Sequence, residues 1–222
     1  MVLFSRGCNF RCPACHAKVF LSAEENNIDS FDLWNYLSRR RKSVGAVVLC
    51  GGEPTVYPDI DEFIVKIKQF GYDVKLDTNG GNPDILEKLI RQKLIDYVAM
   101  DIKAPPELYS NVCGTDIDIS RIEKSIKILS GFSNYEFRTT LVPFYDNDKT
   151  IRFLDKTDII KIAKWLKEVT ANASHKYFIQ KFVSRNEKLL DSRMEQYEPT
   201  PSDIAKEVCM EAKKVLPVCT VR

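Results

Sequence analysis

Apolar residues along the chain recur in short blocks with two different spacings. Residues 46–50 form a continuous apolar run, which is typical of a strand buried on both faces. Further short runs predict strands at residues 2–4, 74–77, 97–101, 137–142 and 177–179. Stretches with helical spacing lie between these runs. The alternation predicts an α/β fold, in which a parallel sheet with helices on its outside curves as a partial parallel (β/α)6 barrel.

Capping residues mark where several of the helices are expected to begin. Ser30 is a predicted N-cap, and Ser120 with Glu123 forms a predicted capping box. The last helix is expected to begin at Pro201 and to be followed by a short edge strand at 218–221. Residues 1–222 are therefore predicted to form one domain, which ends in this helix and strand over 201–222.

Composition restricts the class of protein but not its chemistry. Of the 222 residues, 44% are hydrophobic and 29% are charged, and the net charge is +2. These values give no argument for nucleic acid or an anionic membrane as a partner. No apolar run approaches the roughly 20 residues of a membrane span, and the first five residues are too short for a signal peptide. We therefore expect a cytoplasmic protein with reduced thiols.

The main chemical feature is a loop over residues 8–15, in which Cys8, Cys12 and Cys15 have the spacing C-x3-C-x2-C. Thiolates bind iron and zinc well. Because iron–sulfur clusters usually take four cysteines, three would leave one iron open to a small molecule. His16 offers the alternative of a Cys3His zinc site, whereas a disulfide is disfavoured because nothing in the sequence marks the chain as secreted. The remaining cysteines are interpreted as structural: Cys50, Cys113, Cys209 and Cys219.

Polar residues gather where the predicted strands end, at the edge where open α/β sheets bind ligands. They are Gly51, Gly52 and Glu53 after the second strand, Asp77 and Thr78 at the third, Asp101 and Lys103 at the fourth, and Arg138 within the fifth. An isolated glycine turn or aspartate is ordinary turn chemistry. Two carboxylates at matching positions, Asp77 and Asp101, could also hold a monovalent or divalent cation. The charge of Arg138 needs a partner if it is buried.

The order and spacing of these motifs carry a resemblance to a known family. The cysteine loop is followed by GGEP at 51–54, DTNG at 77–80 and DIKAP at 101–105, each after a predicted strand. The chain resembles the radical S-adenosylmethionine (SAM) enzymes, and most of all the activating proteins of anaerobic ribonucleoside-triphosphate reductase. Pyruvate formate-lyase activating enzyme has a similar pattern. The likeness runs from Ser5 to about Phe182, and EFRTT at 136–140 favours the activase branch.

The resemblance implies cofactors, partners and a role for each residue. Cys8, Cys12 and Cys15 would ligate a [4Fe-4S] cluster, whose fourth iron binds SAM. Gly51, Gly52 and Glu53 would hold the methionine amino group. Asp77, Thr78 and Asp101 would contact the cofactor or a nearby monovalent cation. Lys103 and Arg138 would meet the methionine carboxylate, the ribose or the incoming peptide. Reductive cleavage of SAM would give a 5′-deoxyadenosyl radical that takes a hydrogen atom from the Cα of a glycine. The implied partners are a glycyl-radical enzyme and, as electron donor, flavodoxin or ferredoxin.

Some features leave other interpretations open. Ala14 and Ala17 stand where relatives often have an aromatic residue and Asn, which changes the expected adenine contacts. The alternative functions are a radical SAM enzyme of another branch (pyruvate formate-lyase activase, 7-deazaguanine synthase, or a peptide- or RNA-modifying enzyme) and a zinc-stabilised scaffold without chemistry. The long charged segment 184–199 is predicted to dock a partner protein. A surface or capping role is predicted for His175.

Overall fold

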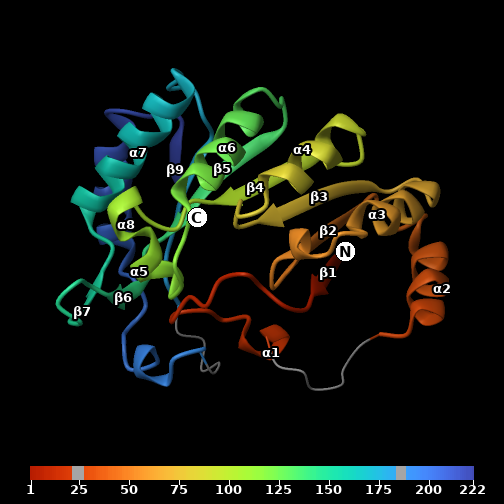
Figure 1. Ribbon diagram of the computed structural model, residues 1–222, viewed down its shortest axis with the longest axis horizontal. Helices are drawn as coiled ribbons and strands as arrows, with labels where there is room; N and C mark the ends of the chain where they lie inside the picture. Colours follow the sequence, from red (N-terminus) through yellow and green to blue (C-terminus); the bar gives the residue numbers. More distant parts are fainter. Residues whose placement is uncertain (22–27, 184–188) are drawn as a thin grey trace.

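The computed structural model describes residues 1–21, 28–183 and 189–222, which form a curved sheet with helices on its outside (Figure 1). All seven strands of the sheet are parallel, and their spatial order follows the chain. They are β1 (Val2–Ser5), β2 (Ala46–Gly51), β3 (Asp73–Thr78), β4 (Tyr97–Asp101), β5 (Tyr135–Thr140), β8 (Tyr177–Gln180) and β9 (Cys219–Val221). In the described part of the chain, β1 and β9 each pair with one neighbour only. The predicted α/β fold with a partial parallel barrel is confirmed.

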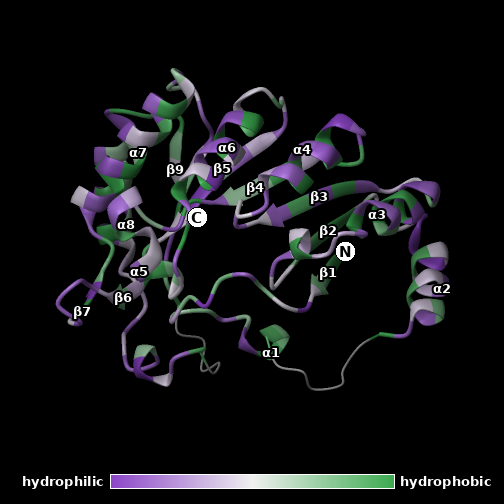
Figure 2. Ribbon diagram, viewed as in Figure 1, coloured by the Kyte–Doolittle hydropathy of each residue, from purple (hydrophilic) through white to green (hydrophobic). Residues whose placement is uncertain are grey.

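The longer helices cover the outer face of this sheet. They are α2 (Ser30–Arg40), α3 (Ile60–Gln69), α4 (Pro83–Arg91), α6 (Ile119–Ser130), α7 (Lys156–Thr170) and α8 (Ser202–Lys213). In Figure 2 several of these helices carry both hydrophobic and hydrophilic colours, as expected when one stripe of a helix packs on a sheet. The core contains Ile64, Ile67 and Leu89 from the helices, packed with strand residues such as Leu76 and Val98.

Alternation along the strands gives the sheet two different faces. Val47, Leu49, Val74 and Leu76 are buried against the helices, and the residues between them point into the barrel because side chains alternate across a strand. The interior positions of β2 are only partly buried, so the expectation of a strand buried on both faces was too strong. The interior of the barrel is therefore where polar strand residues can reach a ligand.

Two predicted helix starts are wrong by one or two residues. Asp29 caps α2 in place of Ser30, with its carboxylate accepting a hydrogen bond at 2.7 Å from the first turn. Asp118 caps α6, so Ser120 and Glu123 form no capping box. In both helices an aspartate lies just before the predicted cap. A carboxylate there both accepts the free N–H groups and interacts favourably with the helix dipole.

Several short elements depart from simple alternation of strand and helix. An antiparallel hairpin of β6 (Pro143–Tyr145) and β7 (Ile151–Phe153) lies between β5 and α7. The predicted fifth strand ended at Val142, two residues beyond β5, and the sequence analysis predicted no hairpin after it. The short helices are α1 (Lys18–Leu21) and α5 (Tyr109–Cys113), and the 3₁₀ turns are η1 (Pro54–Val56), η2 (Pro106–Leu108) and η3 (Ser192–Met194).

His175 is buried, contrary to the predicted surface or capping role. Its Nδ1 lies 2.6 Å from the Tyr135 hydroxyl, and its Nε2 lies 2.7 Å from the Thr170 hydroxyl. Two hydroxyl partners compensate for the loss of water around a buried imidazole.

No helix among the described residues has the length and apolar character needed to span a membrane.

Candidate functional site

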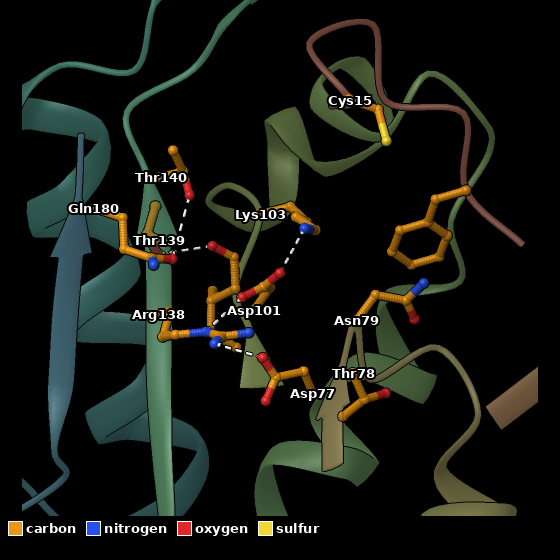
Figure 3. A network of polar contacts seen from close by, with 12 residues as sticks. Cys15, Asp77, Thr78, Asn79, Asp101, Lys103, Arg138, Thr139, Thr140 and Gln180 are labelled. Atoms are coloured by element: carbon orange, nitrogen blue, oxygen red, sulfur yellow. Dashed lines mark hydrogen bonds and ion pairs between the residues drawn. The ribbon is translucent and has the colours of Figure 1, made fainter. Parts of the chain in front are cut away.

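A cavity of about 350 Å³ lies beyond the carboxyl ends of β2 to β5, between the strand ends and the cysteine loop. Residues distant in sequence meet there (Figure 3). All eleven predicted site residues line it: Cys8, Cys12, Cys15, Gly51, Gly52, Glu53, Asp77, Thr78, Asp101, Lys103 and Arg138. The structure thus brings the whole predicted set together on two facing walls. We call these the strand-end wall and the cysteine-loop wall, the latter formed by residues 6–17.

The first part of the cysteine-loop wall is held by the strand-end wall and by α5. The Glu53 backbone N–H donates to the Gly7 carbonyl at 2.8 Å. The Arg11 N–H donates to the Cys113 carbonyl at 2.9 Å, which anchors the loop to the end of α5. A Cβ on Gly52 would overlap the Gly7 carbonyl oxygen, so this position has room only for glycine. The two walls therefore touch directly beside the first thiol.

The second part of this wall is held by a segment near the C-terminus, which we call the strap (residues 189–197). Leu190 N–H donates to the Cys15 carbonyl at 3.1 Å, and Asp191 N–H donates to the Pro13 carbonyl at 3.0 Å. The Asp191 carboxylate accepts a hydrogen bond from the Tyr145 hydroxyl at 2.7 Å. A small apolar cluster supports these contacts and consists of Ala14, Phe182, Leu189 and Met194.

The strap belongs to the segment that was predicted to dock a partner protein. Residues 184–188 of that segment lie outside the described residues, and docking stays a prediction. The described residues 189–197 have another task, since they position the cysteine loop. Nothing in the sequence of the segment indicated this contact, because it joins parts of the chain that are far apart.

The three thiols have different surroundings. Burial raises the pKa of Cys8 and of Cys15. A hydrogen bond from the Cys113 thiol is the main cause that lowers the pKa of Cys12 to about 7. Cys113 is fully buried at the end of α5 and belongs to no motif, so sequence reasoning missed its contact with a site thiol. We conclude that Cys113, which was predicted to be structural, also contacts a thiol of the site.

The arrangement of donors fits an iron–sulfur cluster. In residues 1–21, 28–183 and 189–222, no three His, Cys, Asp or Glu side chains converge on a position for one metal ion. A Cys3His zinc site needs such convergence, and the His16 ring instead contacts the Phe182 ring, with centroids 5.8 Å apart. Three thiols that line one cavity without meeting at a point fit a cluster, in which each thiolate binds a different iron.

Glu53 connects two turns of the strand-end wall. Its side chain is buried, with 1% of its surface exposed. The carboxylate accepts hydrogen bonds from Thr55 N–H at 3.1 Å, Thr55 Oγ1 at 2.6 Å, Thr78 Oγ1 at 2.8 Å and Asn79 N–H at 2.6 Å. Burial raises the pKa of Glu53, while these four donors act in the opposite direction. The carboxylate thus joins the GGEP turn to the DTNG turn.

A network of charges crosses the cavity floor (Figure 3). Arg138 donates from Nε to Asp101 at 2.9 Å and from Nη1 to Asp77 at 3.0 Å. Lys103 contacts the second oxygen of Asp101 at 2.8 Å, and Lys75 contacts the second oxygen of Asp77 at 2.6 Å. Burial alone would raise the pKa of Asp101, but Lys103 and Arg138 outweigh it and lower that pKa to about 2. The partner that Arg138 was predicted to need is therefore a pair of carboxylates.

Two further residues of the site were not predicted. Asn79 donates from its side chain to Asn9 Oδ1 at 2.8 Å and lies 3.7 Å from the Cys8 sulfur, so it links the DTNG turn to the cysteine loop. Lys75 belongs to the charge network. The alternation of side chains along β3 could have found Lys75, because residues two apart in a strand share a face.

Residues 2–157 match the profile of the Radical SAM superfamily. The chain belongs to this superfamily. Membership implies a [4Fe-4S] cluster and SAM as cofactors, and the cavity offers thiols and polar groups of the kinds that both require.

Among curated relatives, a Methanocaldococcus jannaschii protein named "Putative glycyl-radical enzyme activating enzyme" is 34% identical over 191 residues, 83% of this chain and 73% of the relative. A Thermococcus kodakarensis protein named "Probable GTP 3′,8-cyclase" is 30% identical over 58% of this chain, which spans 44% of that relative. Streptococcus suis SuiB, in its crystal structure with SAM, superposes on the whole chain with a TM-score of 0.64 at 17% identity. That match covers 49% of SuiB and concerns the fold alone.

Proposed function

We propose that this protein is a radical SAM activase, which cleaves SAM reductively and removes a hydrogen atom from the Cα of a glycine in a glycyl-radical enzyme. The partner we expect is an anaerobic ribonucleoside-triphosphate reductase. The observation that carries the proposal is the single cavity in which three cysteine thiols face the polar ends of four successive strands. The relative with 34% identity, whose name denotes a glycyl-radical enzyme activating enzyme, supports the activase branch.

The proposal gives each wall of the cavity its own task. When bound, the cluster supplies one electron that cleaves SAM into methionine and a 5′-deoxyadenosyl radical. Cys8, Cys12 and Cys15 hold the cluster, and the backbone at Gly51 and Gly52 meets the methionine amino group. Glu53 acts on that group through the turn that its carboxylate stabilises, since four donors already occupy the carboxylate.

The strand-end charges bind the acidic part of the cofactor. Lys103 is partly buried, with 28% of its side chain exposed, and it keeps its charge because Asp101 more than compensates for desolvation and raises its pKa. We assign Lys103 to the methionine carboxylate, and Asp77 and Thr78 to the rest of the cofactor. Arg138 maintains the position of the two aspartates. The monovalent cation expected beside them is not part of this proposal, because lysine and arginine nitrogens already contact the carboxylate oxygens.

The open edge of the barrel suits a macromolecular substrate. On β1, Val2 and Phe4 are 49% and 57% exposed, and Phe4, whose ring stacks on Phe20 of α1, also lines the cavity. A peptide segment of a partner enzyme can approach along such an edge, whereas a small substrate is usually enclosed. The proposal also includes a single domain over 1–222, a cytoplasmic location, anaerobic activity, and flavodoxin or ferredoxin as the donor of the electron.

The test uses reduced, iron-loaded protein and SAM without oxygen. Separate samples receive an anaerobic ribonucleotide reductase, a pyruvate formate-lyase, or GTP. We expect the electron paramagnetic resonance signal of a glycyl radical on the reductase. A signal on the lyase alone would assign the chain to another activase branch.

A small-molecule reaction is the second candidate. The similarity to a protein named as a GTP 3′,8-cyclase over 58% of the chain favours it. Consumption of GTP in the same test, with no glycyl radical on either partner enzyme, would support this candidate and contradict the activase proposal.

A further inference from the structure

Asp77 and Asp101 are the two carboxylates for which the sequence predicted a bound cation. The structure places three cationic side chains around them instead. Their contacts are Lys75 Nζ to Asp77 Oδ1 at 2.6 Å, Arg138 Nη1 to Asp77 Oδ2 at 3.0 Å, Arg138 Nε to Asp101 Oδ1 at 2.9 Å, and Lys103 Nζ to Asp101 Oδ2 at 2.8 Å. Each of the four carboxylate oxygens therefore faces a cationic nitrogen.

Arg138 is the member of the network that takes the bridging position. It lies on β5 directly opposite Asp101 of β4 in the strand register. Its planar guanidinium reaches both carboxylates at once, which the single ammonium group of a lysine does less well. Only 12% of its side chain is exposed, against 20% for Asp77 and 28% for Asp101, so both ion pairs are partly shielded from water. Arg138 thus stands where a bridging metal ion would stand.

The charge balance of this network also disfavours an additional metal ion. Three cations and two carboxylates leave this network with a net charge of +1. One anionic group, such as a ligand carboxylate, neutralises that charge. An additional alkali-metal ion would either raise it to +2 or displace a guanidinium or ammonium group from a short, poorly hydrated contact, and both are unfavourable where charges are partly buried.

We propose that Arg138 is the built-in counter-cation of Asp77 and Asp101, so that the strand-end wall binds no alkali-metal ion and SAM binds equally well without one. The part that concerns SAM rests on the proposed function, whereas the part that concerns the metal ion does not. The role of Arg138 is to position the two carboxylates.

The first experiment measures cation binding directly. The ²³Na resonance is recorded with cluster-loaded protein and without SAM, for the natural protein and for Arg138→Ala. We expect no saturable broadening with the natural protein. Removal of the guanidinium leaves two carboxylate oxygens facing each other, so Arg138→Ala should broaden the resonance saturably. Broadening by the natural protein that Asp77→Asn abolishes would overturn the proposal.

The second experiment measures the dissociation constant of SAM in potassium, sodium or tetramethylammonium salt at equal ionic strength. For the natural protein we expect the same dissociation constant within about twofold in all three salts, because no alkali-metal ion takes part in binding. A tenfold difference would correspond to about 1.4 kcal/mol of binding free energy. For Arg138→Ala we expect binding at least about tenfold weaker in tetramethylammonium and partly restored by potassium or sodium. A natural protein that binds SAM tenfold more weakly without alkali-metal ions would overturn the proposal.

Arg152 provides a matched control, because it also bridges two aspartates. It contacts Asp146 at 2.6 Å and Asp158 at 2.6 Å, and all three lie outside the lining of the cavity. Arg152→Ala should leave the SAM affinity the same in all three salts. Failure of every protein to bind SAM in any salt would contradict the proposed function, and the ²³Na measurement would still decide the role of Arg138.

Discussion

The two walls of the cavity are positioned in different ways. The strand-end wall is built from consecutive strands of one parallel sheet, and its charges are paired across neighbouring strands, as Arg138 is with Asp101. The cysteine-loop wall contains no strand of its own. It depends on contacts from the GGEP turn, from Cys113 at the end of α5, and from Asp191 in the strap.

Because of this difference, the two walls should respond differently to amino-acid substitutions. Ladder hydrogen bonds and the packed helices position the strand-end wall, so a single substitution there should alter the ligand and leave the backbone in place. The loop is held by a few anchors from distant segments. Loss of one anchor should therefore release a thiol without unfolding the sheet.

The largest effect on activity is expected from a substitution in the cysteine-loop wall. Cys12→Ala should abolish the binding of a complete cluster and lower SAM cleavage on the order of a thousandfold or more, since the chemistry resides in the cofactor. Cys113→Ala removes only the thiol that contacts Cys12 and should retain the iron. Iron content and product formation measure both. Equal loss of iron in the two variants would show that Cys113 is itself a ligand.

Glu53→Ala tests the point where the walls meet. It leaves four buried donors without an acceptor, and we expect a loss of about 3 kcal/mol in the free energy of unfolding, together with weaker SAM binding. Urea unfolding and SAM titration measure these effects. Exposed Glu62 of α3 is the control, and Glu62→Ala should change stability by less than about 0.5 kcal/mol. An unchanged Glu53→Ala protein would mean that the turns are held by other contacts.

Asp191→Ala tests the strap. It removes the acceptor of Tyr145 and of the backbone N–H that begins η3, which should cost about 1 to 2 kcal/mol. We expect iron to pass to a chelator several times faster, because the strap, whose backbone N–H groups donate to the Cys15 and Pro13 carbonyls, loses the side-chain contacts that hold it in place. Asp148, which caps the β6–β7 turn without contacting the strap, is the control. If both variants release iron at the natural rate, the strap does not position the loop.

The smallest expected effect is on the pH dependence of stability, and it concerns His175, which lies outside both walls. Burial lowers the pKa of this histidine, so the folded state disfavours its protonation relative to the unfolded state. The unfolded state binds a proton below about pH 6.5 and the folded state does so only at lower pH, so stability should decrease as pH falls through that range. We expect a decrease of about 1 kcal/mol or less between about pH 7.5 and pH 5.5. His175→Gln should flatten this part of the stability profile, and an unchanged slope would assign it to other groups.

Much of the strand-end wall could be predicted because a repeating pattern encodes it. Apolar runs located the strands, and in a parallel sheet the residues that follow them, such as Glu53 and Asp101, end at one edge. The β6–β7 hairpin was missed because the apolar run around Phe144 continues past the end of β5. Cys113 was missed since its partner, Cys12, belongs to another part of the chain.

The amino-acid sequence by itself determined the parallel sheet, the edge where its strands end, and the three thiols that face this edge, because periodicity and spacing are local properties. Only the tertiary structure decided which groups contact each other: Arg138 between two aspartates, the Cys113 thiol beside Cys12, and the strap beneath Cys15. Such contacts depend on the distance between side chains from separate elements, which no local pattern contains.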